Sequence, residues 1–301
     1  MKQTINDFFD SATHDPAEID VKPRLRVSFS GGRTSAFMSI WIKKNLSHRY
    51  DIKFLFANTS WENIDTLRFV DEVDRRFELG VVWLEAVVHP GRRSCGHRIV
   101  SYETAARNGE VFEAVCAKYG LPNQTFKLCT RELKTNPMDS YARSIGWKKG
   151  SYETAIGIRL DEPRRVRKEA AKRDRIVYPL VDWEPTDKQD VLAFFEGFDW
   201  DLQIPEHDGN CVRCFKKSDN KLLRGYRENP ASFAFPVRLE QLYQHVGPNN
   251  VPGPRKMYRG FRSASELIAQ FDEADFTPAT GDGGCSESCE LYETEQLKMA
   301  F

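Results

Sequence analysis

Two segments of this 301-residue chain combine residue types and spacings that could do chemistry. In SFSGGRTS, residues 28–35, glycines and hydroxyl groups stand between an apolar stretch and a helix-like pattern. In CVRC, residues 211–214, two thiols have the spacing of metal ligands or of a redox pair. The first segment could bind an anion, and the second could bind a metal or exchange electrons.

The first segment is typical of an anion site at the junction of a strand and a helix. Free backbone N–H groups and the helix dipole attract negative charge there, and glycine lets phosphate oxygens approach the backbone. The expected donors are Ser28, Ser30, Gly31, Gly32, Arg33, Thr34 and Ser35. The spacing matches neither GxGxxG nor GxxxxGK(S/T), which excludes the dinucleotide and Walker A motifs. A plain helix cap, in which the glycines only shape a turn, is the alternative.

Arg159 is a further candidate, because it follows an apolar segment at 152–158 that predicts a strand. A guanidinium at a strand end can grip phosphate through two hydrogen bonds and stabilise the charge that develops on it. The alternative is a surface ion pair with Asp161 or Glu162. We predict Arg159 and Arg33 as the catalytic cations.

Alternating strands and helices must position these residues. The expected strands are 24–30, 52–57, 81–88 and 152–158, and the expected helices are 33–46, 62–77, 102–119, 130–145 (with a kink at Pro137) and 187–195. This alternation predicts an α/β fold with a parallel sheet, in which ligands bind beyond the C-terminal strand ends. We therefore expect the ends at Ser30, Asn58 and Ile158 along one edge.

The composition is that of an ordinary globular protein, with 40% hydrophobic, 29% charged and 12% aromatic residues. The 44 basic and 44 acidic residues cancel, so the overall charge neither indicates nor excludes a nucleic-acid partner. No apolar run is long enough to span a membrane, and the polar N-terminus is unlike a signal peptide. We expect a cytoplasmic protein with no membrane partner.

Five segments, in order, resemble the ATP pyrophosphatase (PP-loop) superfamily, and within it the branch of the phosphoadenylylsulfate (PAPS) reductases. They are SFSGGRTS, LFANTSWENIDTLRFVDEV, LCTRELKTNPM, AIGIRLDEPRR and YPLVDW. The chain also resembles a reductase-like subset that is often met in bacteriophage genomes. The resemblance implies a parallel-sheet PP-loop domain (adenine nucleotide alpha hydrolase-like, Rossmann-like) over 24–215 that includes metal-site cysteines. A polar arm over 1–23 and a mostly helical region with an acidic tail over 216–301 complete the expected organisation.

The resemblance implies an adenine nucleotide, ATP or PAPS with Mg²⁺, at the sheet edge. Its phosphates would lie on residues 30–35, Asn58 and Thr59 would line its pocket, Gly157 would pass close to it, and Arg159 would pair with phosphate.

One residue departs from the superfamily's SGGxDS pattern, because Thr34 stands where an aspartate is usual. A hydroxyl binds Mg²⁺ less well than a carboxylate does. The double glycine is retained, however, and this favours ATP with a pyrophosphate leaving group over PAPS.

The resemblance also implies a metal centre built on Cys129, which lies 82 positions before Cys211 (211 − 129 = 82). Adenylylsulfate reductases hold a 4Fe–4S cluster with four cysteines, whereas related sulfur-inserting enzymes use three and leave one iron open. Cys129, Cys211 and Cys214 fit the second arrangement. His207 would complete a Cys₃His set, which is equally a tetrahedral zinc site. We expect the cluster, with zinc or no metal as the alternatives.

The other cysteines are weaker candidates. Cys116 is expected to be buried in a helix, and Cys95 to be an inert surface residue. Cys285 and Cys289 lack the Gly-His that follows the nucleophilic cysteine of the reductases, and the surrounding acids weaken them as nucleophiles. A flexible redox pair at these positions is the alternative.

A basic run at 164–175 holds seven Lys or Arg residues and two acids. A solvated face, a lid over nucleotide phosphates and a contact to a nucleic-acid backbone are the three interpretations.

Three functions follow as hypotheses. The first is an enzyme that adenylates an acceptor with release of pyrophosphate and then delivers sulfur through the metal centre. It requires a sulfur donor or reductant protein, and its acceptor is a nucleobase, a nucleic-acid backbone or a small molecule. The second is a PAPS or adenylylsulfate reductase, and the third is an inactive nucleotide-binding module, for which Thr34 is the main support.

Overall fold

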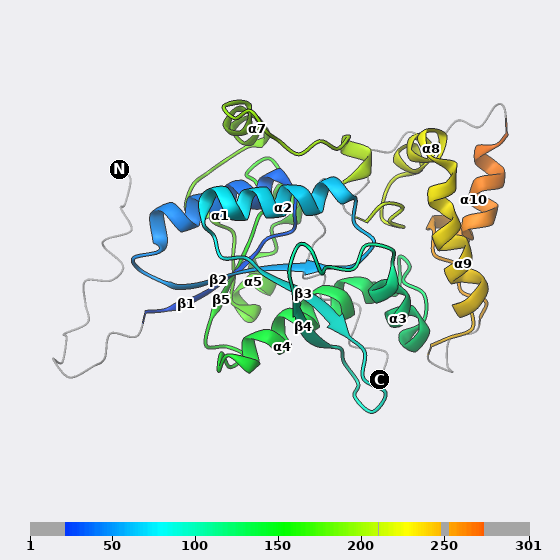
Figure 1. Ribbon diagram of the computed structural model, residues 1–301, viewed down its shortest axis with the longest axis horizontal. Coiled ribbons are helices and arrows are strands. Elements are labelled where there is room, and N and C mark those ends of the chain that lie inside the picture. The colour runs from blue at the N-terminus through cyan, green and yellow to red at the C-terminus, as the bar shows by residue number, and fades with distance from the viewer. Residues whose placement is uncertain (1–21, 210, 248–252, 274–301) are drawn as a thin grey trace.

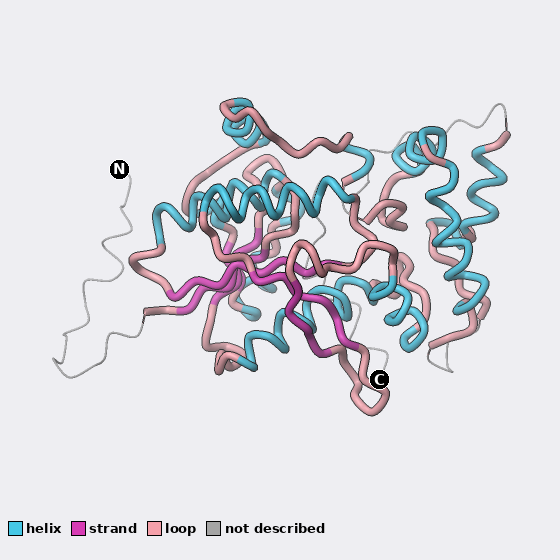
Figure 2. The backbone as a smooth tube through the Cα atoms, viewed as in Figure 1, coloured by secondary structure: helices cyan, strands magenta, loops and turns pink. Residues whose placement is uncertain are grey.

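The computed structural model describes residues 22–209, 211–247 and 253–273. At its centre lies a six-stranded sheet between helices (Figure 1 and Figure 2). The strand order is β4-β3-β2-β1-β5-β6. The strands are β1 (Arg24–Ser28), β2 (Asp51–Asn58), β3 (Val82–Val87), β4 (Gly96–Val100), β5 (Glu153–Ile156) and β6 (Ile176–Val177). All neighbours are parallel except β3 and β4. The predicted α/β class is confirmed, with a mostly parallel sheet consistent with a Rossmann-like domain.

Helices cover both faces of this sheet, and further helices stand at one of its ends (Figure 1). They are α1 (Arg33–Leu46), α2 (Ile64–Phe77), α3 (Glu110–Tyr119), α4 (Asn136–Ser144), α5 (Lys168–Asp174), α6 (Pro179–Asp182), α7 (Lys188–Glu196), α8 (Asp219–Glu228), α9 (Ala234–Tyr243) and α10 (Ala264–Phe271). A π-helix, Cys129–Thr135, precedes α4, and short 3₁₀ turns lie at Pro163–Arg165, Glu206–Asp208, Pro230–Phe233 and Arg259–Phe261. Within the described residues, none of the helices has the length and apolar character needed to cross a bilayer.

Strand alternation divides the core into two layers. Along β2, Phe54 and Phe56 share a buried cluster with α1 and α2, whereas Leu55 and Ala57 share one with Met138 of α4. Figure 1 shows α1 and α2 over one face of the sheet and α4 under the other. The sheet is therefore buried on both faces, as its apolar strands require.

The helices α8, α9 and α10 stand together at one end of the sheet, beside α3 (Figure 1). Their buried residues Leu222, Leu239 and Phe271 share one core with Phe112 and Cys116 of α3. The described part of the C-terminal region is thus helical, and the boundary after residue 215 stays a prediction.

Two stretches differ from the sequence-based expectations. The helix expected at 102–119 exists only as α3, which begins after Gly109 in a left-handed conformation (φ 88°), and an unexpected strand, β4, precedes it. The charged run at 164–175 contains the helix α5, and the strand β6 follows the run directly; neither element was expected. Pro137 lies in the first turn of α4, where a missing N–H costs little, at the junction with the π-helix.

Candidate functional site

The loop after β1 and the loop after β5 meet at the centre of the sheet. β1 pairs with β2 on one side and with β5 on the other, where Ser28 lies opposite Ile156. The chain builds the sheet outward from β1 through β2 and β3 and then returns to the opposite side of β1, so the strand order reverses between β1 and β5. Open α/β sheets bind ligands at such a switch point. The predicted loop 28–35 and the segment 157–159 both leave the sheet there.

The β1–α1 loop turns tightly at two glycines with different roles. Gly31 has a φ of 85°, and a Cβ atom there would lie 2.6 Å from Cγ2 of Thr66, so the fold itself requires glycine. Gly32 is the N-cap of α1 with φ −98° and ψ 161°, which any residue can adopt. Because Gly32 has no side chain, it leaves the free N–H groups of the first turn of α1 without a side-chain cap from that position.

Hydroxyl groups brace this loop. The Ser35 Oγ accepts hydrogen bonds from the backbone N (3.1 Å) and the Oγ (3.0 Å) of Ser30. It donates one to the carbonyl of Gly32 (2.9 Å). Gly157 packs against the same turn, since a Cβ atom at Gly157 would lie 3.1 Å from the Ser35 Cα. The structure therefore brings these predicted residues together.

Arg159 connects the two loops. Its Nη1 donates to the Thr34 Oγ1 (2.9 Å), and its Nε donates to the Asp161 Oδ1 (2.9 Å). Its Nη2 lies 3.7 Å from Oε1 of Glu162, and only 9% of the side chain is exposed. The ion pair named as the alternative is present, and the same guanidinium reaches the loop. Asp161 consequently places a carboxylate at the edge where Thr34 lacks one.

Arg33 differs from its predicted phosphate-facing role. Its Nε donates to the Asp201 Oδ1 (2.7 Å), and its Nη2 donates to the Asp201 Oδ2 (2.8 Å) and to the Leu202 carbonyl (2.7 Å). This bidentate pair holds the guanidinium against the segment that follows α7. In the structure, Arg33 therefore clamps the start of α1 to residues 201–202.

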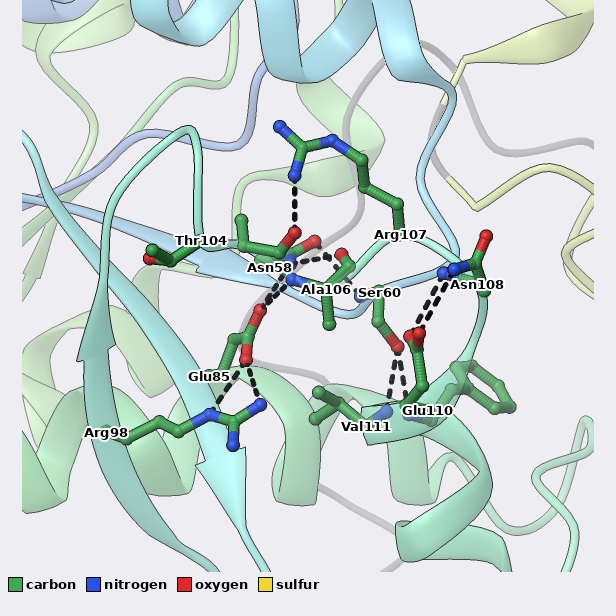
Figure 3. A network of polar contacts seen from close by, with 12 residues as sticks. Asn58, Ser60, Glu85, Arg98, Thr104, Ala106, Arg107, Asn108, Glu110 and Val111 are labelled. Atoms are coloured by element: carbon green, nitrogen blue, oxygen red, sulfur yellow. Dashed lines mark hydrogen bonds and ion pairs between the residues drawn. The ribbon is translucent and has the colours of Figure 1, made fainter.

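Asn58 belongs to a buried polar network at the end of β2 (Figure 3). Its Nδ2 donates to the Glu85 Oε1 and to the Ala106 carbonyl, both at 2.8 Å. Its Oδ1 accepts from the Ser60 N–H at 3.0 Å. The fully buried Glu85 also accepts from the Ala106 N–H (2.7 Å) and from Arg98 (2.6 Å). Asn58 is thus engaged by the protein's own groups.

Replacing Glu85 with alanine is expected to lower the free energy of unfolding by about 3 kcal/mol, because buried donors of Asn58 and Ala106 lose their acceptor. Urea denaturation measures the change. The exposed Glu196→Ala is the matched control, expected within about 0.5 kcal/mol of the parent. Equal midpoints for the two variants would contradict the importance of the network.

The three thiols predicted as ligands lie in one buried cluster. Cys129, Cys211 and Cys214 are 8%, 7% and 6% exposed and share a core with α3. The Cys211 loop lies against the end of β2, where Glu62 and Cys211 form a β-bridge. Thr59, which is also fully buried, places its Oγ1 3.3 Å from the Cys211 Sγ. The cysteine loop therefore borders the same sheet edge as the β1–α1 loop.

Buried lysines accompany these thiols. Lys134 lies 3.8 Å from Glu62, Lys216 donates to Thr130 Oγ1 (3.4 Å), and the Lys217 Nζ donates to the Val212 carbonyl (2.9 Å). Burial lowers the pKa of Lys217 to about 8. These buried lysines suit a negatively charged ligand, because opposite charges offset the cost of burying each other.

His207 is not grouped with the thiols. Its Nε2 lies 2.8 Å from the Glu228 Oε2, and the ligand atoms of His207, Asp208 and Glu228 all lie within 4.8 Å of one another. Across the part of the chain that the structure describes, no such group of three includes a thiol. A tetrahedral zinc ion with Zn–S bonds of about 2.3 Å needs sulfur atoms about 3.8 Å apart. A preformed Cys₃His zinc set is therefore not observed.

The remaining cysteines fall into three cases. Cys116 is fully buried, as expected. Cys95 is buried as well, which corrects the expected surface position, and this burial raises the pKa of its thiol to about 12. Cys285 and Cys289 lie outside the described residues.

Comparison with known proteins relates the chain to a bacteriophage protein and to an archaeal protein. No protein-family model matches it. The uncharacterized nin region protein ORF290 of Escherichia phage lambda is 31% identical over 286 residues, which cover 88% of this chain and 94% of the phage protein. The chain belongs to the family of that phage protein. The uncharacterized protein MJ0973 of Methanocaldococcus jannaschii is 24% identical over 169 residues, 54% of this chain and 34% of the archaeal protein.

Proposed function

We propose that this member of the phage lambda ORF290 family is a PP-loop enzyme, of PAPS reductase-like type, that binds ATP on residues 30–35. One observation carries the proposal: the β1–α1 loop and the β5 end meet at the switch point of the sheet, and Arg159 bridges them through Thr34. Three features suit a chain of phosphates. The N-terminus of α1 has no side-chain cap, Gly32 has a backbone conformation that does not itself require glycine, and the guanidinium of Arg159 is buried beside them.

The proposed reaction begins with adenylation. An acceptor oxygen attacks the α-phosphorus of ATP, the bond to the β-phosphate oxygen breaks, and pyrophosphate leaves. Arg159 stabilises the charge that develops on the α-phosphate, and the first-turn N–H groups of α1 bind the departing phosphates. Asp161, held beside Arg159, supplies a carboxylate oxygen that can bind Mg²⁺. Sulfide then attacks the acceptor atom that carries the adenylated oxygen, the bond from that atom to the oxygen breaks, and AMP leaves with the oxygen.

The thiol cluster fits an iron–sulfur centre in this scheme. Cys129, Cys211 and Cys214 would hold a 4Fe–4S cluster, whose open iron supplies a binding place for sulfide. Three thiolates that each bind a different iron would lie farther apart than three ligands of one ion. This agrees with the described residues, in which no group of three ligand atoms within 4.8 Å includes a thiol. Lys217 and its neighbours offset the negative charge of the bound thiolates. The sulfide comes from a sulfur-donor protein.

The two glycines provide a test. Gly32→Ala is expected to leave the free energy of unfolding within about 1 kcal/mol of the parent. It should nevertheless weaken ATP binding at least about tenfold, because a methyl group stands where phosphate oxygens approach. Gly31→Ala should instead destabilise the fold by more than about 1 kcal/mol, because of its φ and the contact with Thr66. Isothermal titration calorimetry and urea denaturation measure both. Unchanged ATP binding in Gly32→Ala would mean that the glycines only shape a turn.

A further inference from the structure

A surface pocket of about 890 Å³ opens beside the end of β5. Its apolar lining consists of Leu160, Pro163, Val166, Ala170 and Val181, and its charged lining of Arg164, Arg167, Lys168 and Glu169. Leu160 directly follows Arg159 and is 53% exposed. This pocket, called the basic groove below, therefore begins one residue from the proposed phosphate site.

The cations of the basic groove have no side-chain hydrogen bond or ion-pair partner in the part of the chain that the structure describes, although Glu169 also lines the groove. These cations are Arg164, Arg167 and Lys168. Their neighbour Arg165, by contrast, is paired with Glu162 at 2.6 Å. The cations that line the groove are thus the ones left available for a ligand.

The strip of available charge extends beyond the groove. Lys172 lies one helical turn after Lys168 on α5, on the same side of the helix, and it too has no partner among the described residues. A single phosphate group could contact only some of these cations. A nucleic-acid strand, which has a phosphate at every nucleotide, could contact all of them.

We infer that the basic groove binds a segment of single-stranded nucleic acid. Arg164, Arg167 and Lys168 of the groove, with Lys172 beside it, contact successive phosphates. The aliphatic floor from Leu160 to Val181 covers the apolar face of an unstacked base. The adjoining Arg159 loop then places this nucleotide next to the α-phosphate of ATP. The identification of the strand as the acceptor rests on the proposed function, whereas the binding of the strand does not.

The test uses the full-length protein and a triple variant, Arg164→Ala/Arg167→Ala/Lys168→Ala. Fluorescence anisotropy measures the binding of labelled 20-nucleotide single strands, DNA and RNA of one sequence, over a range of salt concentrations. The triple variant should raise Kd at least about tenfold, and the slope of log K against log salt should become shallower by about 2, at roughly 0.7 per lost phosphate contact. A control variant, Lys43→Ala/Lys44→Ala/Arg49→Ala, removes equal charge at the C-terminal end of α1, on the opposite edge of the sheet. It should change Kd less than twofold.

Three results would overturn the inference: no binding of either strand, equal effects of the two triple variants, or complete displacement of the strand by an equimolar mononucleotide. Calorimetric titration of the same proteins with ATP separates this inference from the proposed function. We expect ATP affinity within twofold of the parent in both triple variants. Strand binding without ATP binding would support the groove and contradict the adenylating enzyme, and ATP binding without strand binding would do the reverse.

Discussion

Arg159→Ala is expected to slow pyrophosphate release from ATP by about 10²–10³-fold. The guanidinium is buried beside Thr34 and is held at the β5 end by Asp161, so its charge is fixed where the α-phosphate would react. Because it acts on charge that develops during the reaction, kcat should fall far more than ATP affinity. Arg159→Lys should recover only a small part of the rate, since an ammonium group lacks the two-pronged geometry.

A matched control separates this role from a structural one. Arg68→Ala removes an exposed arginine of α2 that is paired with Asp65 and should leave the rate unchanged. Circular dichroism and urea denaturation should show that Arg159→Lys remains folded. Equal losses of kcat and of ATP affinity in a folded Arg159→Lys protein would assign the residue to ground-state binding alone. An unchanged rate would contradict its catalytic role.

The second large effect concerns the thiol cluster. The parent protein, purified without oxygen, should contain about four iron and four sulfide per chain, and alanine at Cys129, Cys211 or Cys214 should reduce both to below about one. Metal and acid-labile sulfide analysis measures this directly, and the loss of brown colour accompanies it.

Two other buried cysteines of the same core serve as controls. Cys95→Ala and Cys116→Ala remove thiols of similar burial that we do not place at the cluster, so they should retain iron and sulfide. A parent protein with one zinc per chain and no sulfide would contradict the cluster. Equal iron loss in Cys95→Ala and Cys129→Ala would contradict the choice of ligands.

Local signals were sufficient to predict the part of the fold that positions the candidate site. The predicted helix over residues 33–46 and α1 have the same bounds, because an apolar strand, two glycines and a helical period succeed one another without interruption. β2 and β3 likewise follow from continuous apolar runs. The segment LCTRELKTNPM, which contains Lys134, was part of the resemblance, but the pairing of Lys134 with Glu62 could not be predicted from it.

Pairings between distant residues could not be predicted. Asp201, which holds Arg33, is 168 positions away and belongs to no recognisable motif. His207 and Glu228 are hydrogen-bonded although 21 positions separate them, and the sequence does not specify how the chain between them folds. The strand β4 was missed because GHRIV is short and polar, as edge strands often are. For Arg159, the ion pair with Asp161 is observed, and the same guanidinium also donates to Thr34, whereas its contact with phosphate stays a prediction.

Backbone hydrogen–deuterium exchange with and without ATP and Mg²⁺ tests most directly whether an adenine nucleotide lies at the switch point. We expect slower exchange in peptides that cover residues 31–35 and 157–160, with no change in α9. Binding of ATP without protection of residues 31–35, or protection confined to another part of the chain, would contradict this expectation.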